Sequence, residues 1–146
     1  MKYCGEVMTK NPVFCLADDN VETAAGVMKE EQVGPVPIVE DEDSLKVIGI
    51  VTDRDLVLRV LAEKRDPKKT TLGEVMSKKL ISCKESDDLE EAMKAMSDHQ
   101  IRRIPVVDAK NRLVGIISLA DLATRAEEPE KTAEVVEGIS EPTTGK

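Results

Sequence analysis

The stretch Gly5-Glu6-Val7-Met8-Thr9-Lys10 recurs later in the chain as Gly73-Glu74-Val75-Met76-Ser77-Lys78. The likeness continues outward from this stretch, because residues 5–39 align with residues 73–107 without a gap and residues 49–56 align with residues 115–122. Self-similarity at a fixed spacing indicates a duplicated structural unit. Since each copy has only about 55 residues and would bury little surface alone, we expect the two copies to pack against each other.

Both copies predict the same order of elements, β-α-β-β-α. The first helix of each copy carries apolar side chains at helical spacing and is preceded by a D-x-x-E pattern, which predicts a capping box from Asp19 to Glu22 and from Asp87 to Glu90. The second helix of each copy begins at Thr52 or Ser118. The apolar helix positions are Val21, Ala24, Ala25 and Met28 in the first copy and Leu89, Ala92, Met93 and Met96 in the second. The predicted strands are 13–15, 36–39 and 47–51 in the first copy and 81–83, 104–107 and 113–117 in the second.

A further segment follows the second copy. Glu128-Pro129-Glu130 predicts the start of a short helix that runs to Glu137, because proline is favoured in a first turn. We expect its Ala133, Val136 and Ile139 to dock on the rest of the protein, and residues 141–146 to fray.

These motifs, in this order and twice over, resemble the cystathionine β-synthase (CBS) domain family. The resemblance covers nearly all of residues 3–126 and implies an α/β (α+β) fold, in which two β-α-β-β-α CBS repeats pack about a pseudo-twofold axis into one CBS-pair module. We therefore expect a first CBS domain at 3–62, a linker at 63–72, a second CBS domain at 73–126 and a C-terminal extension at 127–146, with a short helix and then a frayed tail. The motifs that carry the resemblance are Val-Met-Thr-Lys (7–10), Val-Met-Ser-Lys (75–78), Val-Pro-Ile-Val (36–39), Ile-Pro-Val-Val (104–107), Gly-Ile-Val-Thr-Asp-Arg-Asp (49–55) and Gly-Ile-Ile-Ser-Leu-Ala-Asp (115–121).

The composition excludes several classes of protein. With one Tyr, one Phe, no Trp and a net charge of −8, the chain lacks both the aromatic platforms and the basic surface that nucleic-acid binding needs. No apolar run approaches the roughly 20 residues of a membrane span. Three cysteines and one histidine match no zinc spacing, and the chain offers no nucleophile–base pair or Gly-rich phosphate loop. We expect a cytoplasmic protein that is not an enzyme and has no metal, nucleic-acid or membrane role.

A hydroxyl and a carboxylate three residues apart end the last strand of each copy, as Ser118 and Asp121 and as Thr52 and Asp55. A carboxylate can accept both ribose hydroxyls, and a helix start suits a phosphate. The same spacing also forms a capping box, in which the carboxylate serves only its own helix. The motif alone leaves both interpretations open. The resemblance adds that this Asp holds the ribose of a bound adenosine nucleotide, with the hydroxyl near the phosphate.

The two predicted clefts differ in the basic residues that could bind a phosphate. Arg102 and Arg103 precede the second Ile-Pro-Val strand, and a guanidinium is a natural partner of phosphate, although both could equally be solvated or paired with the acidic surface. In the first copy Pro35 takes the place of Arg103, so that cleft ranks second, with Arg54 as a possible source of charge. The main predicted cleft is Met8, Thr9, Val13, Val33, Gly34, Pro35, Arg103, Ile116, Ser118 and Asp121. The second is Ile50, Thr52, Arg54, Asp55, Ile81, Ile101 and Arg102.

The resemblance implies a non-catalytic regulatory module that binds AMP, ADP or ATP and signals energy or ligand state to a regulated protein whose identity the sequence does not contain. No catalytic cofactor is expected. We also expect a homodimer built from the helices after Thr52 and Ser118. The alternative is a pure dimerisation or interaction module with empty clefts. Cys15 and Cys83 are repeat mates that could form a redox pair, but buried apolar roles fit a reducing cell better, and Cys4 could be exposed and reactive.

Overall fold

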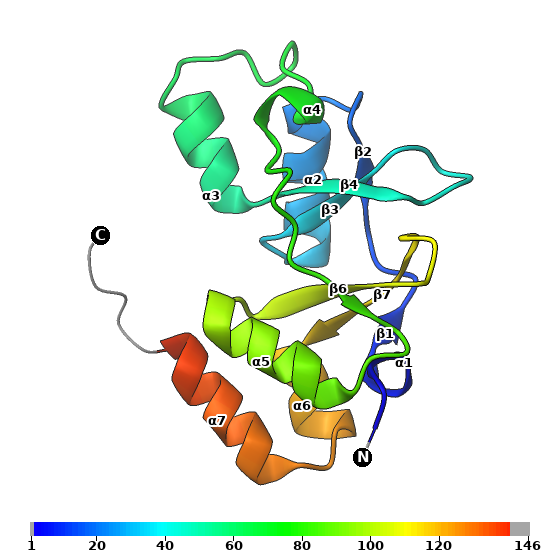
Figure 1. The fold of residues 1–146 in the computed structure, drawn as a ribbon. Coiled ribbons are helices and arrows are strands. Elements are labelled where there is room, and N and C mark those ends of the chain that lie inside the picture. The colour runs from blue at the N-terminus through cyan, green and yellow to red at the C-terminus, as the bar shows by residue number, and fades with distance from the viewer. Residues whose placement is uncertain (1, 141–146) are drawn as a thin grey trace. The chain divides into compact units, whose positions relative to one another are not determined.

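The computed structural model describes residues 2–140 and divides the chain into two compact units (Figure 1). Unit 1 takes Met1–Pro12, Ile81–Ala109 and Val114–Lys146, and unit 2 takes Val13–Leu80 and Lys110–Leu113. The β-α-β-β-α order predicted for each repeat is confirmed, so the fold is mixed α+β with two sheets.

Unit 1 is built on a sheet with the strand order β1-β7-β6-β5. The start of the chain contributes α1 (Cys4–Val7) and β1 (Thr9–Lys10), and β1 pairs antiparallel with β7. The remaining elements are β5 (Cys83–Lys84), α5 (Leu89–His99), β6 (Arg103–Val107), β7 (Leu113–Ser118), α6 (Leu119–Arg125) and α7 (Pro129–Ser140).

Unit 2 is built on a sheet with the strand order β2-β3-β4, in which β2 and β3 are parallel and β3 and β4 antiparallel. Its elements are β2 (Cys15–Leu16), α2 (Val21–Glu31), β3 (Val36–Val39), β4 (Val47–Val51), α3 (Asp53–Leu56), the π-helix η1 (Val57–Leu61) that continues α3, and α4 (Leu72–Val75).

The opening segments of the two repeats are exchanged between the units. The opening of the first repeat, with Cys4 and Val7 fully buried, packs into the core of unit 1, whose other members come from the second repeat and from α7. The opening of the second repeat, with Leu72 and Val75 buried, packs into the core of unit 2 among residues of the first repeat. Each hydrophobic core therefore needs side chains from both repeats.

The helix starts differ from the prediction. The capping boxes from Asp19 to Glu22 and from Asp87 to Glu90 are wrong, because α2 and α5 begin one residue later, with Asn20 and Asp88 as N-caps. The carboxylates of Asp19 and Asp87 instead accept hydrogen bonds from the backbone N–H groups of Leu16 (2.9 Å) and Lys84 (2.8 Å). Asp side chains readily close such turns, and here they close the turn after each short strand.

Two apolar predictions on helices are also wrong. Ala25 is exposed, whereas Met93, at the same place in the second repeat, is buried. The difference arises because α7 packs on α5 beside Met93. On α7 itself Val135 is buried and Ile139 packs on the core of unit 1, while Ala133 and Val136 are exposed, so only Ile139 docks as expected. The helix runs to Ser140 rather than Glu137, and the predicted frayed tail at 141–146 lies outside the described residues.

Candidate functional site

The junction of β7 and α6 places a hydroxyl beside a carboxylate. Ser118 ends β7 and is the N-cap of α6, and its Oγ accepts a hydrogen bond from the backbone N–H of Asp121 (3.2 Å). Asp121 Oδ2 accepts hydrogen bonds in return from the backbone N–H (3.0 Å) and the hydroxyl (3.2 Å) of Ser118. The capping box that the sequence left open is thus present, and one oxygen of Asp121 is used in it.

The opening segment of the chain forms the other side of this carboxylate. Thr9 in β1 pairs with Ile116 in β7, and the Thr9 hydroxyl donates a hydrogen bond to Asp121 Oδ1 (2.9 Å). Asp121 is 6% exposed and is the one buried acidic residue within residues 2–140, whereas Thr9 is exposed. A buried carboxylate that receives a hydroxyl from an exposed side chain can exchange that donor for another hydroxyl.

Arg125 closes the arrangement from one turn along α6. Its Nη1 donates to the backbone carbonyl of Met8 (3.1 Å), and its Nε lies 4.0 Å from Asp121 Oδ1. Unit 2 repeats the pattern, since Arg59 Nη1 donates to the carbonyl of Val75 (2.8 Å) and its Nε lies 3.8 Å from Asp55 Oδ1. The sequence analysis missed both arginines. The signal was available, because each follows its Asp by four residues in both repeats.

Arg103 is the first residue of β6, the strand next to β7 in the sheet, and its side chain is half-buried. The backbone N–H of Leu119 donates to the carbonyl of Arg102 (3.2 Å), which brings the start of β6 to the start of α6. Arg103 has no ion-pair partner within the described part of the chain. A half-buried guanidinium without a carboxylate partner is available to an anion.

Unit 2 carries the corresponding site, but its Asp55 is only half-buried and, among the described residues, receives no hydrogen bond from Ser77, the counterpart of Thr9. Thr52 and Asp55 form a reciprocal capping box, with the Thr52 N–H donating to Asp55 Oδ2 (2.9 Å), and Ile50 pairs with Ser77 as Ile116 pairs with Thr9. At the place of Arg103, however, unit 2 has Pro35. The carboxylate is present and the second guanidinium is absent, as the sequence predicts.

The residues of each predicted cleft are divided between the two units. In the main cleft Met8, Thr9, Arg103, Ile116, Ser118 and Asp121 lie in unit 1, while Val13, Val33, Gly34 and Pro35 lie in unit 2. In the second cleft Ile50, Thr52, Arg54 and Asp55 lie in unit 2, while Ile81, Ile101 and Arg102 lie in unit 1. That the two groups of each set share one ligand stays a prediction.

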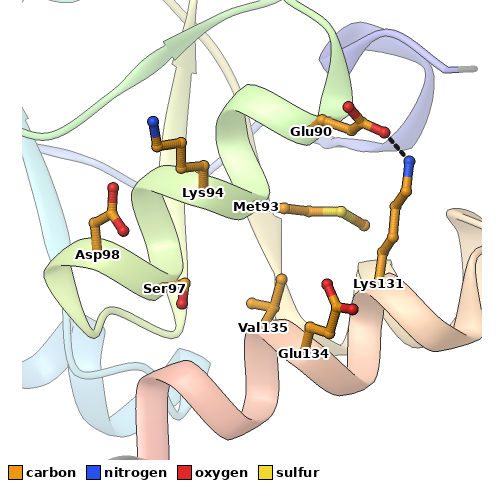
Figure 2. A pocket seen from close by; sticks show the side chains of 8 residues that line it. All are labelled: Glu90, Met93, Lys94, Ser97, Asp98, Lys131, Glu134 and Val135. Carbon is orange, nitrogen blue, oxygen red and sulfur yellow. Dashed lines mark ion pairs between the residues drawn. The ribbon is translucent and has the colours of Figure 1, made fainter.

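A groove of about 350 Å³ that the sequence did not predict lies between α5 and α7. Figure 2 shows the side chains that line it. Its carboxylates come from Glu90, Asp98 and Glu134, and the Lys131 ammonium is paired with Glu90 and Glu128. No residue of either predicted cleft lines the groove. The lining is Glu90, Met93, Lys94, Ser97, Asp98, Lys131, Glu134 and Val135.

Two features absent from the described residues bear on function. Within residues 2–140, no group of three or more His, Cys, Asp and Glu side chains is placed to hold a metal ion. Over the same part of the chain, no helix combines the length and the apolar character needed to cross a membrane.

Comparison with known proteins adds the following matches. A family model described as CBS domain matches residues 4–62 and 72–128. The protein YlbB of Bacillus subtilis (strain 168) is 40% identical over 136 residues, which cover 93% of this chain and 90% of that protein. The structure of CBSX2 in complex with AMP has a TM-score of 0.74 and 26% identity, and covers 89% of this chain and 99% of that one. The CBS domain pair of protein MJ0100, in complex with methylthioadenosine and S-adenosyl-L-methionine, has a TM-score of 0.70 and 28% identity, and covers 84% and 94%.

Proposed function

Because the chain belongs to the CBS domain family, we propose that it is a regulatory module that binds an adenosine nucleotide, with the ribose on Asp121 and the phosphate near Ser118 and Arg103. The observation that carries the proposal is the buried Asp121 carboxylate, one oxygen of which accepts a hydrogen bond from an exposed hydroxyl, in the same unit as Arg103, which has no ion-pair partner among the described residues. CBS-pair proteins are regulatory modules, and the module acts by binding rather than by catalysis.

The ligand class is supported by the two solved relatives. AMP, methylthioadenosine and S-adenosyl-L-methionine differ at the 5′ position and share adenosine. A ribose diol would donate to Asp121 Oδ1 in place of the Thr9 hydroxyl, so binding would exchange hydrogen bonds rather than leave a buried acceptor unsatisfied. Arg103 favours a phosphate over the sulfonium of S-adenosyl-L-methionine. That Val13, Gly34 and Pro35 hold the base stays an expectation from the sequence.

Titration calorimetry with AMP, ADP, ATP and S-adenosyl-L-methionine tests the proposal. Loss of a charged hydrogen-bond partner costs roughly 1.5–3 kcal/mol, so Asp121→Ala and Arg103→Ala should each weaken binding by about one to two decades. Asp55→Ala should do less, because Pro35 leaves its site without the second anchor. Arg103→Ala is the cleaner variant, since Arg103 takes no part in the capping box that Asp121→Ala also removes.

A pure dimerisation module is the second candidate. It is favoured by the π-helix η1, on which Val57, Leu58 and Leu61 are 51%, 48% and 68% exposed. If no nucleotide produces heat with the wild-type protein, this candidate replaces the first. If all four proteins bind a nucleotide with equal affinity, nucleotide binding stands and the assigned site is wrong.

A further inference from the structure

Two of the three cysteines meet inside unit 1. Cys4 in α1 and Cys83 in β5 are both buried, at 0% and 6% exposure, in the same hydrophobic core. The Cys4 thiol donates to the carbonyl of Asp88 (3.7 Å) and the Cys83 thiol to the carbonyl of Pro105 (3.8 Å), and each thiol is the strongest influence on the pKa of the other. The backbone around them is closely tied, because the N–H of Cys4 donates to the carbonyl of Asp87 (2.9 Å) and the N–H of Gly5 donates to the carbonyl of Glu85 (2.9 Å). The pairing differs from the one considered from the sequence, since Cys15 lies in unit 2 and Cys4 is not exposed.

The duplicated unit shows that packing does not require two thiols. In unit 2 the residue at the place of Cys4 is Leu72, which is fully buried in the same core as Cys15. A Leu beside a Cys therefore fills this position of the fold. The second thiol in unit 1 adds a reactive pair that the fold does not need.

We propose that Cys4 and Cys83 are a reversible redox site, in which a peroxide converts the two thiols into a disulfide that ties the opening segment of the chain to β5. The Cys4 thiolate attacks one oxygen of the peroxide, the O–O bond breaks, and hydroxide leaves to form a sulfenic acid. Cys83 then attacks the Cys4 sulfur, the S–S bond forms, the S–O bond breaks and water leaves. The two sulfur atoms together lose two electrons, and hydrogen peroxide becomes two waters.

The pKa values of the two thiols indicate which of them reacts with the peroxide first. The neighbouring Cys83 thiol holds the pKa of Cys4 below its ordinary value, while the Cys4 thiol and burial raise the pKa of Cys83. Since the thiolate is the nucleophile, Cys4 reacts first. Burial raises the pKa of Cys15 to about 11, so Cys15 stays a thiol under the same conditions. Because Cys4 is fully buried, a small oxidant reaches it only when α1, a helix of four residues, opens transiently.

The disulfide would act on the segment that carries the site. Met8 and Thr9 follow α1 directly, and both are bonded to α6 through Arg125 and Asp121. A covalent bond from Cys4 to β5 restrains this segment in the unfolded chain as well, and a bond that closes a long loop stabilises the folded state. The inference concerns the thiols and does not depend on nucleotide binding.

Treatment of the full-length protein with hydrogen peroxide tests the proposal, and the Cys4→Leu variant, which copies the arrangement of unit 2, is the matched control. In the wild type we expect free thiols to fall from three to one, a cross-linked peptide that joins Cys4 to Cys83, and recovery with dithiothreitol. The oxidised wild type should melt several degrees above the reduced form. After the same treatment, Cys4→Leu should keep the free thiols of Cys15 and Cys83, and its melting temperature should not change. Cross-links between chains, a sulfinic acid in place of the disulfide, a bond to Cys15, or no oxidation would each overturn the proposal.

Discussion

The hydroxyl of Thr9 donates a 2.9 Å hydrogen bond to the buried carboxylate of Asp121, and this bond joins two residues of unit 1 that lie far apart in the sequence. The other oxygen of Asp121 caps α6 through Ser118. Asp121 therefore joins the opening segment of the chain to the start of α6. The carboxylate that we assign to the ribose is also a structural tie, because Oδ2 caps α6 while Oδ1, the oxygen that the ribose would take, bonds Thr9 in the absence of a ligand.

Removal of the Thr9 hydroxyl should show how much its hydrogen bond to Asp121 contributes to stability. Thr9→Val keeps the shape of the side chain but leaves Asp121 Oδ1 without its donor, so we expect the free energy of unfolding to fall by about 1 kcal/mol. Ser77→Ala is the matched control, because Ser77 holds the place of Thr9 in unit 2 and makes no side-chain hydrogen bond to Asp55 among the described residues. Chemical denaturation of both variants measures the difference. An equal loss in the two variants would show that the bond to Asp121 adds nothing.

Gly115 should tolerate no side chain, because β1 packs closely against β7 where Lys10 pairs with Gly115. A Cβ at Gly115 would overlap the Met8 side chain and lie 2.9 Å from the Thr9 carbonyl oxygen, which is backbone and cannot move aside. We expect Gly115→Ala to destabilise the protein by about 1–3 kcal/mol. Gly26→Ala is the control, since nothing lies within 4 Å of its added Cβ inside α2, and it should stabilise by about 0.5–1 kcal/mol. Thermal unfolding of both variants would contradict the argument if Gly115→Ala melted at or above the wild type.

The sequence predicted the elements of both repeats and the Ser118–Asp121 junction, because each of these is a local pattern that occurs twice. It did not predict that Thr9 bonds to Asp121. The local sequence of an opening segment does not indicate which repeat it packs against. That depends on tertiary packing, in which Val7 fills the core of unit 1 and Val75 fills the core of unit 2. The exposure of Ala25 has the same kind of cause, since α7 covers the corresponding Met93 and its docking face depends on tertiary contacts.

The exchange of opening segments predicts that the two repeats do not fold apart. A cut near Pro67 removes Leu72 and Val75 from the core of unit 2, and removes Cys4, Val7 and Met8 from the core of unit 1. Circular dichroism should show no cooperative melting for residues 1–67 or 68–146 alone. The mixed fragments should regain a transition, because each supplies the segment that the other lacks. Cooperative melting of either fragment near the temperature of the intact protein would contradict this view.

The capping box of α4 predicts one source of acid sensitivity. The backbone N–H and the hydroxyl of Thr71 donate to Glu74 (2.7 and 3.1 Å), and Arg65 lies 3.1 Å away, which together hold the pKa of Glu74 below its ordinary value of 4.5. A carboxyl group whose pKa is lower in the folded state stabilises above its unfolded pKa and loses this contribution as the pH falls through its folded value. We expect the melting temperature of Glu74→Gln to lie below that of the wild type at pH 6, and the gap to close below about pH 4.5. A gap that is constant with pH would exclude the ionised carboxylate as its cause.

The π-helix η1 predicts where a second copy of the chain binds. Val57, Leu58 and Leu61 are about half exposed or more, whereas the apolar side chains exposed on α6, those of Ala120 and Ala123, are small. Large exposed apolar side chains that cluster on one helix are typical of an interface, so we expect a homodimer in which η1 contributes more than α6. Leu58→Glu and Leu61→Glu should each shift sedimentation velocity from dimer to monomer, because a charge cannot be buried there without a partner. Val136→Glu, at an apolar position of α7 that is 43% exposed, should leave the dimer intact. A wild-type protein that sediments as a monomer at every concentration would remove the dimer, and a dimer that survives both η1 variants would move its interface away from η1.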